Sequence, residues 1–259
     1  MRPVSTDLVE ILVLAVAGVA AGAINAVAGG GSLITFPVLI ALGLPALTAN
    51  ITNTIAQTPG YVSGVYGYRG MLRGQGARVR RLAPLALVGG ALGVVALKVG
   101  SADTFRAIVP ALILLACGLL AAGPHLRRRM AARQADGDEP APPTIVLDAA
   151  VVLTGVYISY FGAAAGVMLL SVLALLVTDT LQRLNAVNRL LVLIVNAPAA
   201  VVLAILGPVD WTAVAILAPT TLIGGSLGVV LARRLSDRAL RAAVITIGVG
   251  VAVYLIASA

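Results

Sequence analysis

The chain has little charge, few aromatic side chains and almost no histidine or cysteine. Only 11% of its 259 residues are Asp, Glu, Lys or Arg, whereas 60% are hydrophobic. Soluble domains carry about a quarter charged residues, so this composition excludes an ordinary soluble fold and makes lipid the expected solvent. The single cysteine, Cys117, excludes a disulfide framework, and its place in an apolar run favours a small packing residue.

Acidic side chains are absent from the interior of the apolar segments. Those nearest to such segments stand at their ends or in loops: Asp7, Glu10, Asp148, Asp179 and Asp210. The only histidine, His125, lies in a polar connection. A buried carboxylate proton relay, a side-chain metal site and a catalytic triad therefore have no candidates. We expect no enzyme activity, no catalytic residues, no metal and no cofactor.

Apolar segments recur along the whole chain and predict an all-α polytopic integral membrane protein. Each half holds five, at about 8–28, 32–44, 47–67, 82–99 and 104–122, then 144–161, 165–178, 184–206, 211–231 and 238–257. A full span needs about 20 residues, so 32–44 and 165–178 are expected to be broken or re-entrant helices. The weakly charged start favours a first membrane helix over a signal peptide.

The sequence contains an internal duplication. Residues 82–95 read LAPLALVGGALGVV and residues 217–230 read LAPTTLIGGSLGVV, with ten of fourteen positions identical at an offset of 135. Further upstream, an offset of 133 relates Gly29 to Gly162. A duplicated half in an apolar chain is typical of transporters built from two repeats.

The duplication divides the chain into three parts. We predict a first transmembrane repeat at 1–122 and a second at 144–259. Between them, the basic, proline-rich stretch 123–143 is expected to be a cytoplasmic linker.

Basic residues occupy different loops in the two halves. The loop at 69–81 holds five arginines and its equivalent at 204–216 has no Lys or Arg, whereas 98–106 holds Lys98 and Arg106 and its equivalent at 233–241 holds four arginines. By the positive-inside rule the two repeats are inverted, with both termini outside and the linker inside. The net charge of +8 then reflects orientation in a membrane rather than binding to nucleic acid.

A glycine-rich turn interrupts the first half. Gly29, Gly30 and Gly31 precede Ser32, a good N-cap residue, and a short helical pattern. A helix that begins at membrane depth directs unpaired N–H groups at a ligand and favours an anion. The alternative is close helix packing by small residues. Asn25 and Thr35 flank this turn, and Tyr160, Gly162 and Gly166 mark its less glycine-rich counterpart in the second half.

The next segment of each half opens with two asparagines on one helical face. Asn50 and Asn53 are followed one turn later by Gln57, and the offset of 135 places Asn185 and Asn188 at the equivalent positions. Amides in lipid are costly unless they are paired. They are therefore candidates either for binding a substrate or for hydrogen bonding between helices.

Arg189 is the sharpest single candidate. It lies about one and a half turns into an apolar segment, and an arginine at membrane depth suits an oxyanion. Snorkelling of the side chain to the interface is the alternative. The equivalent first-half residue is Thr54, so the expected site is asymmetric in charge.

Three stretches of the chain resemble the sulfite exporter TauE/SafE family of membrane proteins. They are AGGGSLITFPVLIALGLPALTANITNTIAQTPGYVSGVYGYRG at 28–70, and GVYISYFGAAAGVMLLSVLALL at 155–176 with LNAVNRLLVLIVNAPAAVVLAILGPVDW at 184–211. The resemblance covers nearly the whole chain. It implies a multi-pass permease of the bacterial inner membrane that moves sulfite, or organosulfonates such as sulfoacetate. The chain departs from the family in having alanines at 163–165, where glycine is common, and Arg189 where lysine is frequent.

Residues and resemblance together predict a secondary transporter for a small sulfur-containing anion, working by alternating access. The expected partners are this anion and the lipid bilayer, no nucleic acid is expected, and a homodimer is compatible with the sequence. Tyr66, Tyr68, Tyr157 and Tyr160 are candidates for gates or interfacial anchors. The alternatives are transport of a cation or a neutral solute by the same fold, a passive channel, and an integral-membrane enzyme.

Overall fold

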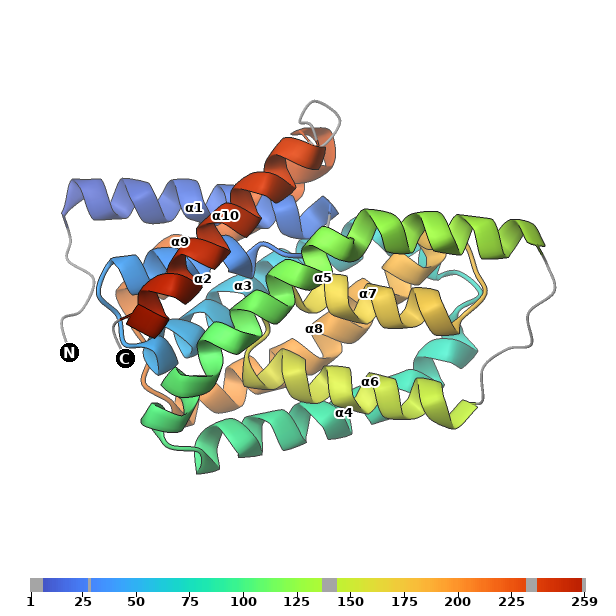
Figure 1. Cartoon of the computed structure of the whole chain (residues 1–259), viewed down its shortest axis with the longest axis horizontal. Coiled ribbons are helices and arrows are strands. Elements are labelled where there is room, and N and C mark those ends of the chain that lie inside the picture. Colours follow the sequence, from blue (N-terminus) through green and yellow to red (C-terminus); the bar gives the residue numbers. More distant parts are fainter. Residues whose placement is uncertain (1–6, 28, 137–143, 232–236, 258–259) are drawn as a thin grey trace.

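The computed structural model describes residues 7–27, 29–136, 144–231 and 237–257 (Figure 1). These residues form ten α-helices and one 3₁₀ helix, with no strand among them. The first half holds α1 (Leu8–Val27), α2 (Ser32–Ala41), α3 (Ala46–Tyr68), the 3₁₀ helix η1 (Arg69–Leu72), α4 (Gly76–Val99) and α5 (Ala102–Asp136). The second half holds α6 (Thr144–Tyr160), α7 (Ala165–Leu176), α8 (Leu181–Leu206), α9 (Trp211–Leu231) and α10 (Asp237–Ala257). Each predicted apolar segment corresponds to one α-helix.

The polar connection between the halves is partly helical. Helix α5 continues to Asp136 and so occupies much of the stretch 123–143, which the sequence suggests is a linker. The reason is local propensity, because Leu, Arg, Met, Ala and Gln dominate the extension and are strong helix formers. Residues 137–143 lie outside the described residues, as do Arg233 and Arg234 of the second basic loop.

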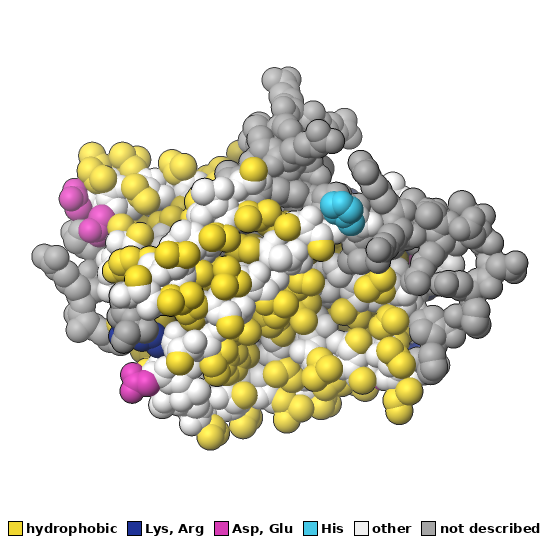
Figure 2. All heavy atoms as spheres, in the orientation of Figure 1, with side chains coloured by type: hydrophobic (Ala, Val, Ile, Leu, Met, Phe, Trp, Pro, Cys, Tyr) yellow, Lys and Arg dark blue, Asp and Glu magenta, His cyan; other side chains and the backbone are white. Residues whose placement is uncertain are grey.

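The length and surface of the helices are those of a membrane protein. Four are long and apolar enough to cross a bilayer, at Leu8–Ala26, Gly76–Val99, Ala102–Gly123 and Leu181–Leu206. Large apolar side chains such as Val99 and Ile205 remain mostly exposed, and Figure 2 shows hydrophobic side chains spread over the visible face. Lipid is the solvent that such a surface requires. The chain is therefore an all-α polytopic membrane protein.

The two short helices form hairpins with the helices that precede them. Helices α2 and α7 have 10 and 12 residues. At a rise of 1.5 Å per residue they are about 15 and 18 Å long, roughly half of the hydrocarbon core. Helix α2 packs against α1, and α7 packs against α6. In Figure 1 the first hairpin lies to the left and the second to the right, and their tips meet in the middle of the molecule.

Helix packing follows the internal duplication. Helix α1 packs on α9, and the equivalent helix α6 packs on α4. The duplicated GGxLG motif lies at both crossings: a methyl group on Gly224 would overlap the carbonyl oxygen of Val19, and one on Gly89 would overlap that of Val152. Val19 and Val152 are themselves related by the offset of 133. The motif therefore brings the backbone of each half against the first helix of the other.

The opposite orientation of the halves in the membrane stays a prediction. If each hairpin returns to the end where it began, α3–α5 and α8–α10 are the crossings, three in each half. An odd number of crossings still inverts the second repeat relative to the first. In Figure 1 the start of α1 and the end of α10 lie at one end of the molecule, and the end of α5 and the start of α6 lie at the other.

Candidate functional site

The tips of the two hairpins are in direct backbone contact. Gly29 and Gly162, the equivalent residues of the two turns, have φ angles of +78° and +73°. The backbone N–H of Gly166 donates to the carbonyl oxygen of Gly29 at 3.2 Å. A methyl group on Gly29 would lie 2.7 Å from the Cα of Gly166, so a side chain at this point would separate the tips.

Ser32 joins the tips rather than capping its own helix. The N-cap residue of α2 is Gly31, with no side-chain cap, so the expectation that Ser32 is the N-cap is wrong. Its hydroxyl instead donates to the carbonyl oxygen of Gly162 at 3.3 Å. A polar residue expected to serve the local helix thus connects the two halves.

Five predicted site residues form a closed hydrogen-bond network behind the first tip. Asn25 of α1 accepts from the backbone N–H of Gly31 at 2.7 Å and donates to Gln57 at 2.8 Å. Gln57 donates to the hydroxyl of Thr35 at 2.7 Å, and Thr35 donates to Asn53 at 2.5 Å. All four side chains are at most 2% exposed. The network therefore fixes α1, α2 and α3 to one another at the depth of the turn.

Asn50 and Asn188 bind backbone at the second tip. Asn50 donates to the carbonyl oxygen of Tyr160, the last residue of α6, at 3.0 Å. Asn188 donates to the carbonyl oxygen of Gly166 at 3.0 Å, and Asn185 accepts a long 3.5 Å hydrogen bond from Asn188. Among the described residues the Oδ1 atoms of Asn50 and Asn188 have no partner although they are buried. Both amides retain capacity for a further contact.

Arg189 points inward, to the end of α1. Its Nη1 and Nη2 atoms donate to the carbonyl oxygens of Asn25 and Ala26, the latter at 3.0 Å. These carbonyls belong to the last turn of α1, where the helix dipole attracts a cation. Gly64 leaves room for the side chain, since a methyl group there would lie 3.2 Å from its Cδ. At 6% exposure, Arg189 does not snorkel to the interface.

The positive charge of Arg189 has no acidic partner within the described part of the chain. Its Nε atom is buried and also lacks an acceptor there. Carbonyl groups compensate a buried guanidinium only in part, because they carry no net charge. The surroundings of Arg189 are therefore electrostatically suited to an anion.

Backbone donors at the tips are only partly free. The N–H of Gly31 is used by Asn25 and that of Gly166 by Gly29, whereas the N–H of Gly30 finds no acceptor among the described residues. A methyl group on Gly30 would meet only side-chain atoms, at 3.8 and 4.0 Å. Gly30 is therefore one of the tip residues whose backbone N–H is not used within the described part of the chain.

Three further residues of α3 surround Arg189, of which sequence reasoning missed Tyr61 and Gly64 and named Tyr68 only as a candidate gate or anchor. Tyr61 lies beside Ser32 and Arg189, Gly64 makes room for the guanidinium stem, and the ring of Tyr68 lies 5.5 Å from the Arg189 Cζ. Continuing the spacing of Asn53 and Gln57 along α3 by four, three and four residues reaches these positions. The helical face that carries the amides is thus longer than the amide pattern alone suggests.

A basic hollow lies at the end of α3. It has a volume of about 500 Å³ and is lined by Gly67, Arg69, Gly70 and Arg73. Tyr68 is flanked in the chain by two of these residues while its ring faces Arg189.

Of the other tyrosines, Tyr157 donates to the carbonyl oxygen of Ala163 at 2.6 Å and fixes the second tip. The described residues contain no group of three or more His, Cys, Asp or Glu that could hold a metal ion.

Comparison with known proteins gives a family and one distant relative. The sequence profile of the family described as sulfite exporter TauE/SafE matches residues 14–255. A protein of Sinorhizobium sp named "Probable membrane transporter protein ORF9" is 28% identical over 156 residues, which cover 59% of this chain and 56% of that protein. The alignment thus spans little more than half of the relative. No solved structure matches the chain significantly.

Proposed function

The chain belongs to the sulfite exporter TauE/SafE family of membrane transporters, and from this premise we propose that it is a permease for a small sulfur-containing anion. Sulfite or an organosulfonate would cross the bacterial inner membrane by alternating access of the two repeats. The observation that carries this proposal is the burial of Arg189 with no acidic partner among the described residues.

A bound oxyanion would neutralise the charge of Arg189 and accept hydrogen bonds from donors that the protein leaves unused. A guanidinium forms stronger, charge-assisted hydrogen bonds with a sulfite or sulfonate group than with neutral carbonyls. The anion would accept from Arg189 in competition with the carbonyls of Asn25 and Ala26, and from the N–H of Gly30. The Asn188 amide supplies a further polar contact beside the second tip.

The hairpins supply a physical basis for alternating access. Among the described residues, the tips meet through one backbone hydrogen bond, from Gly166 to Gly29, and through the Ser32 hydroxyl contact with Gly162. Movement of one tip past the other would also break the contacts of Asn50 with Tyr160 and of Arg189 with the end of α1. The amide network would keep the first hairpin intact. Arg189 lies on α8 but holds α1, so anion binding couples the two halves.

Thermal stabilisation by sulfite and by a sulfonate tests the binding step in purified protein. A ligand at about 100 times its dissociation constant stabilises the folded state by about 2.7 kcal/mol. We expect this shift in the native chain and in the Arg69→Gln control, which removes an exposed charge, but not in Arg189→Gln. Stabilisation by Na⁺ or a neutral solute, with none by oxyanions, would favour the alternative substrates.

Uptake of labelled sulfite or sulfonate into proteoliposomes tests transport itself. We expect Arg189→Ala and Asn53→Ala to lose most of the uptake rate, while Arg69→Gln keeps it. Wild-type rates in both variants would show that the site is elsewhere. Formation of a new chemical product would indicate an enzyme, and conduction far above carrier rates would indicate a channel.

A further inference from the structure

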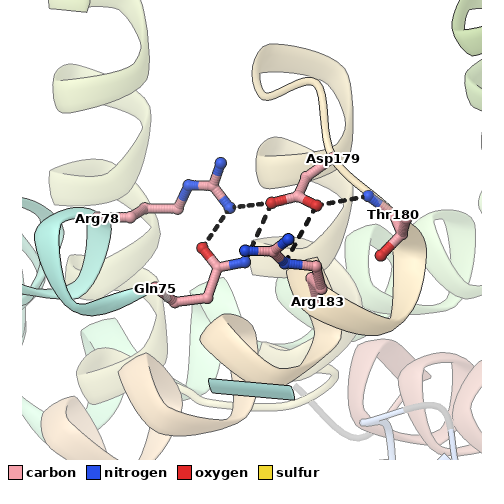
Figure 3. A network of polar contacts seen from close by, with 5 residues as sticks. All are labelled: Gln75, Arg78, Asp179, Thr180 and Arg183. Carbon is pink, nitrogen blue, oxygen red and sulfur yellow. Dashed lines mark hydrogen bonds and ion pairs between the residues drawn. The ribbon is translucent and has the colours of Figure 1, made fainter. Parts of the chain in front are cut away.

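A polar cluster joins the two halves at the end of the molecule where the first half carries its basic loop. It consists of Gln75, Arg78, Asp179, Thr180 and Arg183 (Figure 3). We call this set the Asp179 cluster. Gln75 and Arg78 stand at the start of α4, Asp179 and Thr180 connect α7 to α8, and Arg183 lies in the first turn of α8.

The Asp179 carboxylate is at the centre of the cluster. Its Oδ2 atom accepts from Arg78 Nη1 at 2.6 Å and from Gln75 Nε2 at 3.0 Å. Its Oδ1 atom accepts from the backbone N–H of Thr180 at 2.8 Å and lies 3.5 Å from Arg183 Nε. Arg78 also donates to Gln75 at 2.7 Å, so the contacts support one another. The Asp179 side chain is 12% exposed, which makes this pair stronger than an open surface pair.

The cluster spans a boundary that alternating access must open. Helix α7 runs from the tip at Gly166 to the loop that carries Asp179. Asp179 therefore lies at the base of the second hairpin, opposite its tip. Its main partners belong to the first half. A relative movement of the halves at this end has to separate Asp179 from Arg78.

The internal duplication shows that the opposite end is closed differently. At the offset of 135, Asp179 corresponds to Leu44 and Arg78 to Ala213. Both are buried in the hydrophobic core, at 4% and 0% exposure. The ion pair is therefore replaced by apolar side chains at the equivalent positions, although Gln75 corresponds to the buried Asp210.

We propose that the Asp179 cluster is an ion-pair gate. It controls access to the Arg189 site from the end of the molecule that carries the basic loop at 69–81. This inference rests on the proposed function as a permease. Opening separates the Asp179 carboxylate from Arg78 and Arg183 and exposes two guanidinium groups to an incoming anion. Arg183 lies six residues before Arg189 on α8, which places the two charges about 9 Å apart along the helix axis. An anion would thus pass from Arg78 and Arg183, which also contact Asp179, to Arg189, which has no acidic partner among the described residues.

Thiol labelling measures opening of this gate without any substrate. The reporter is Val187→Cys in a Cys117→Ser background, because Val187 is 0% exposed and belongs to the apolar layer formed with Leu82, Leu173 and Leu184. A membrane-impermeant maleimide is added to the full chain in lipid nanodiscs. The reporter thiol of the parent protein should react slowly.

Asp179→Asn keeps the shape of the side chain and removes its charge, so labelling should accelerate about tenfold or more. The matched control is Asp148→Asn, which removes the 2.6 Å ion pair of Asp148 with Arg81 on the same helix α4. That pair joins α4 to α6, which the close contact of Gly89 with Val152 already holds together, so labelling should not change. Exchange of the charges by Arg78→Asp with Asp179→Arg should restore slow labelling.

Equal labelling of the parent and Asp179→Asn would overturn the gate. If Asp179→Asn does not fold, Arg78→Gln applies the same test from the other side of the pair. The proposed function fails separately: if no oxyanion is bound or transported but Asp179→Asn accelerates labelling, the gate stands and serves another solute. If sulfite is transported but labelling does not respond, the gate alone is wrong.

Discussion

The Cα atoms of Gly29 and Gly166 face each other so closely that neither residue has room for a side chain. A methyl group on Gly166 would lie 2.8 Å from the Gly29 Cα, and the Gly166 N–H donates to the Gly29 carbonyl oxygen at 3.2 Å. These two residues lie in different halves and each stands at the tip of a hairpin. Their contact makes the centre of the molecule a backbone interface rather than a side-chain interface.

Gly166→Ala should therefore destabilise the protein. The added methyl group meets backbone atoms, which cannot rotate away, so we expect a loss of about 3 kcal/mol, at the upper end for overpacking. Thermal unfolding in detergent measures it. Gly30→Ala is the matched control, because its methyl group would find ordinary contacts at 3.8 Å or beyond. A Gly166→Ala protein as stable as Gly30→Ala would mean that the tips are not in contact.

The duplicated glycines lead to a second prediction. Gly89→Ala and Gly224→Ala should destabilise the protein by similar amounts, about 1–3 kcal/mol each, because both methyl groups would overlap a carbonyl oxygen of the facing helix. Gly118→Ala, within α5, meets nothing within 4 Å and should be neutral or stabilising by about 0.5–1 kcal/mol through helix propensity. Unequal effects at Gly89 and Gly224 would contradict equivalent packing of the two halves.

Periodicity predicted the helices and one helical face of the site. Asn53 and Gln57 are one turn apart, and spacing alone places them together. Asn25 was also a candidate, but its hydrogen bond to Gln57 could not be predicted, because the two residues lie 32 apart in the chain and meet only through tertiary packing. The depth of Arg189 followed from its apolar neighbours, but its contacts with α1 are made 163 and 164 residues away.

Asp179 illustrates the limit of sequence reasoning most clearly. In the sequence it is an acid in a short loop, with no pattern that distinguishes it from Asp148 or Asp210. Gln75 and Arg78 lie 104 and 101 residues away, and only the fold brings them to the same carboxylate. The duplication carried a usable signal, since Leu44 at the equivalent position shows where the two ends of the molecule differ.

Ala164 should be more stable as glycine. Its φ of +55° is in the left-handed region, which costs a residue with a Cβ roughly 1–2 kcal/mol. After the extra chain entropy of glycine is subtracted, Ala164→Gly should gain about 0.5–1 kcal/mol in thermal unfolding. Ala163→Gly, next to it and without a positive φ, should lose stability instead. A loss in both variants would show that the second turn does not adopt this conformation.

The gate at Asp179 should hold across the neutral range and open only in acid. Burial acts to raise the pKa of the Asp179 carboxyl, but the hydrogen bonds from Arg78, Gln75 and Thr180 and the charge of Arg78 outweigh it and lower the pKa below its ordinary value of 3.8. A lowered pKa means that the ionised, bonded form contributes stability above that value and is lost as the pH falls through the lowered pKa. Labelling of the Val187→Cys thiol, corrected for the reactivity of a free thiol, should therefore stay constant from about pH 8 to pH 5 and rise only below the ordinary range of aspartate. In Asp179→Asn the corrected rate should be high throughout, and a rise of the parent rate between pH 8 and pH 6 would contradict control by this carboxylate.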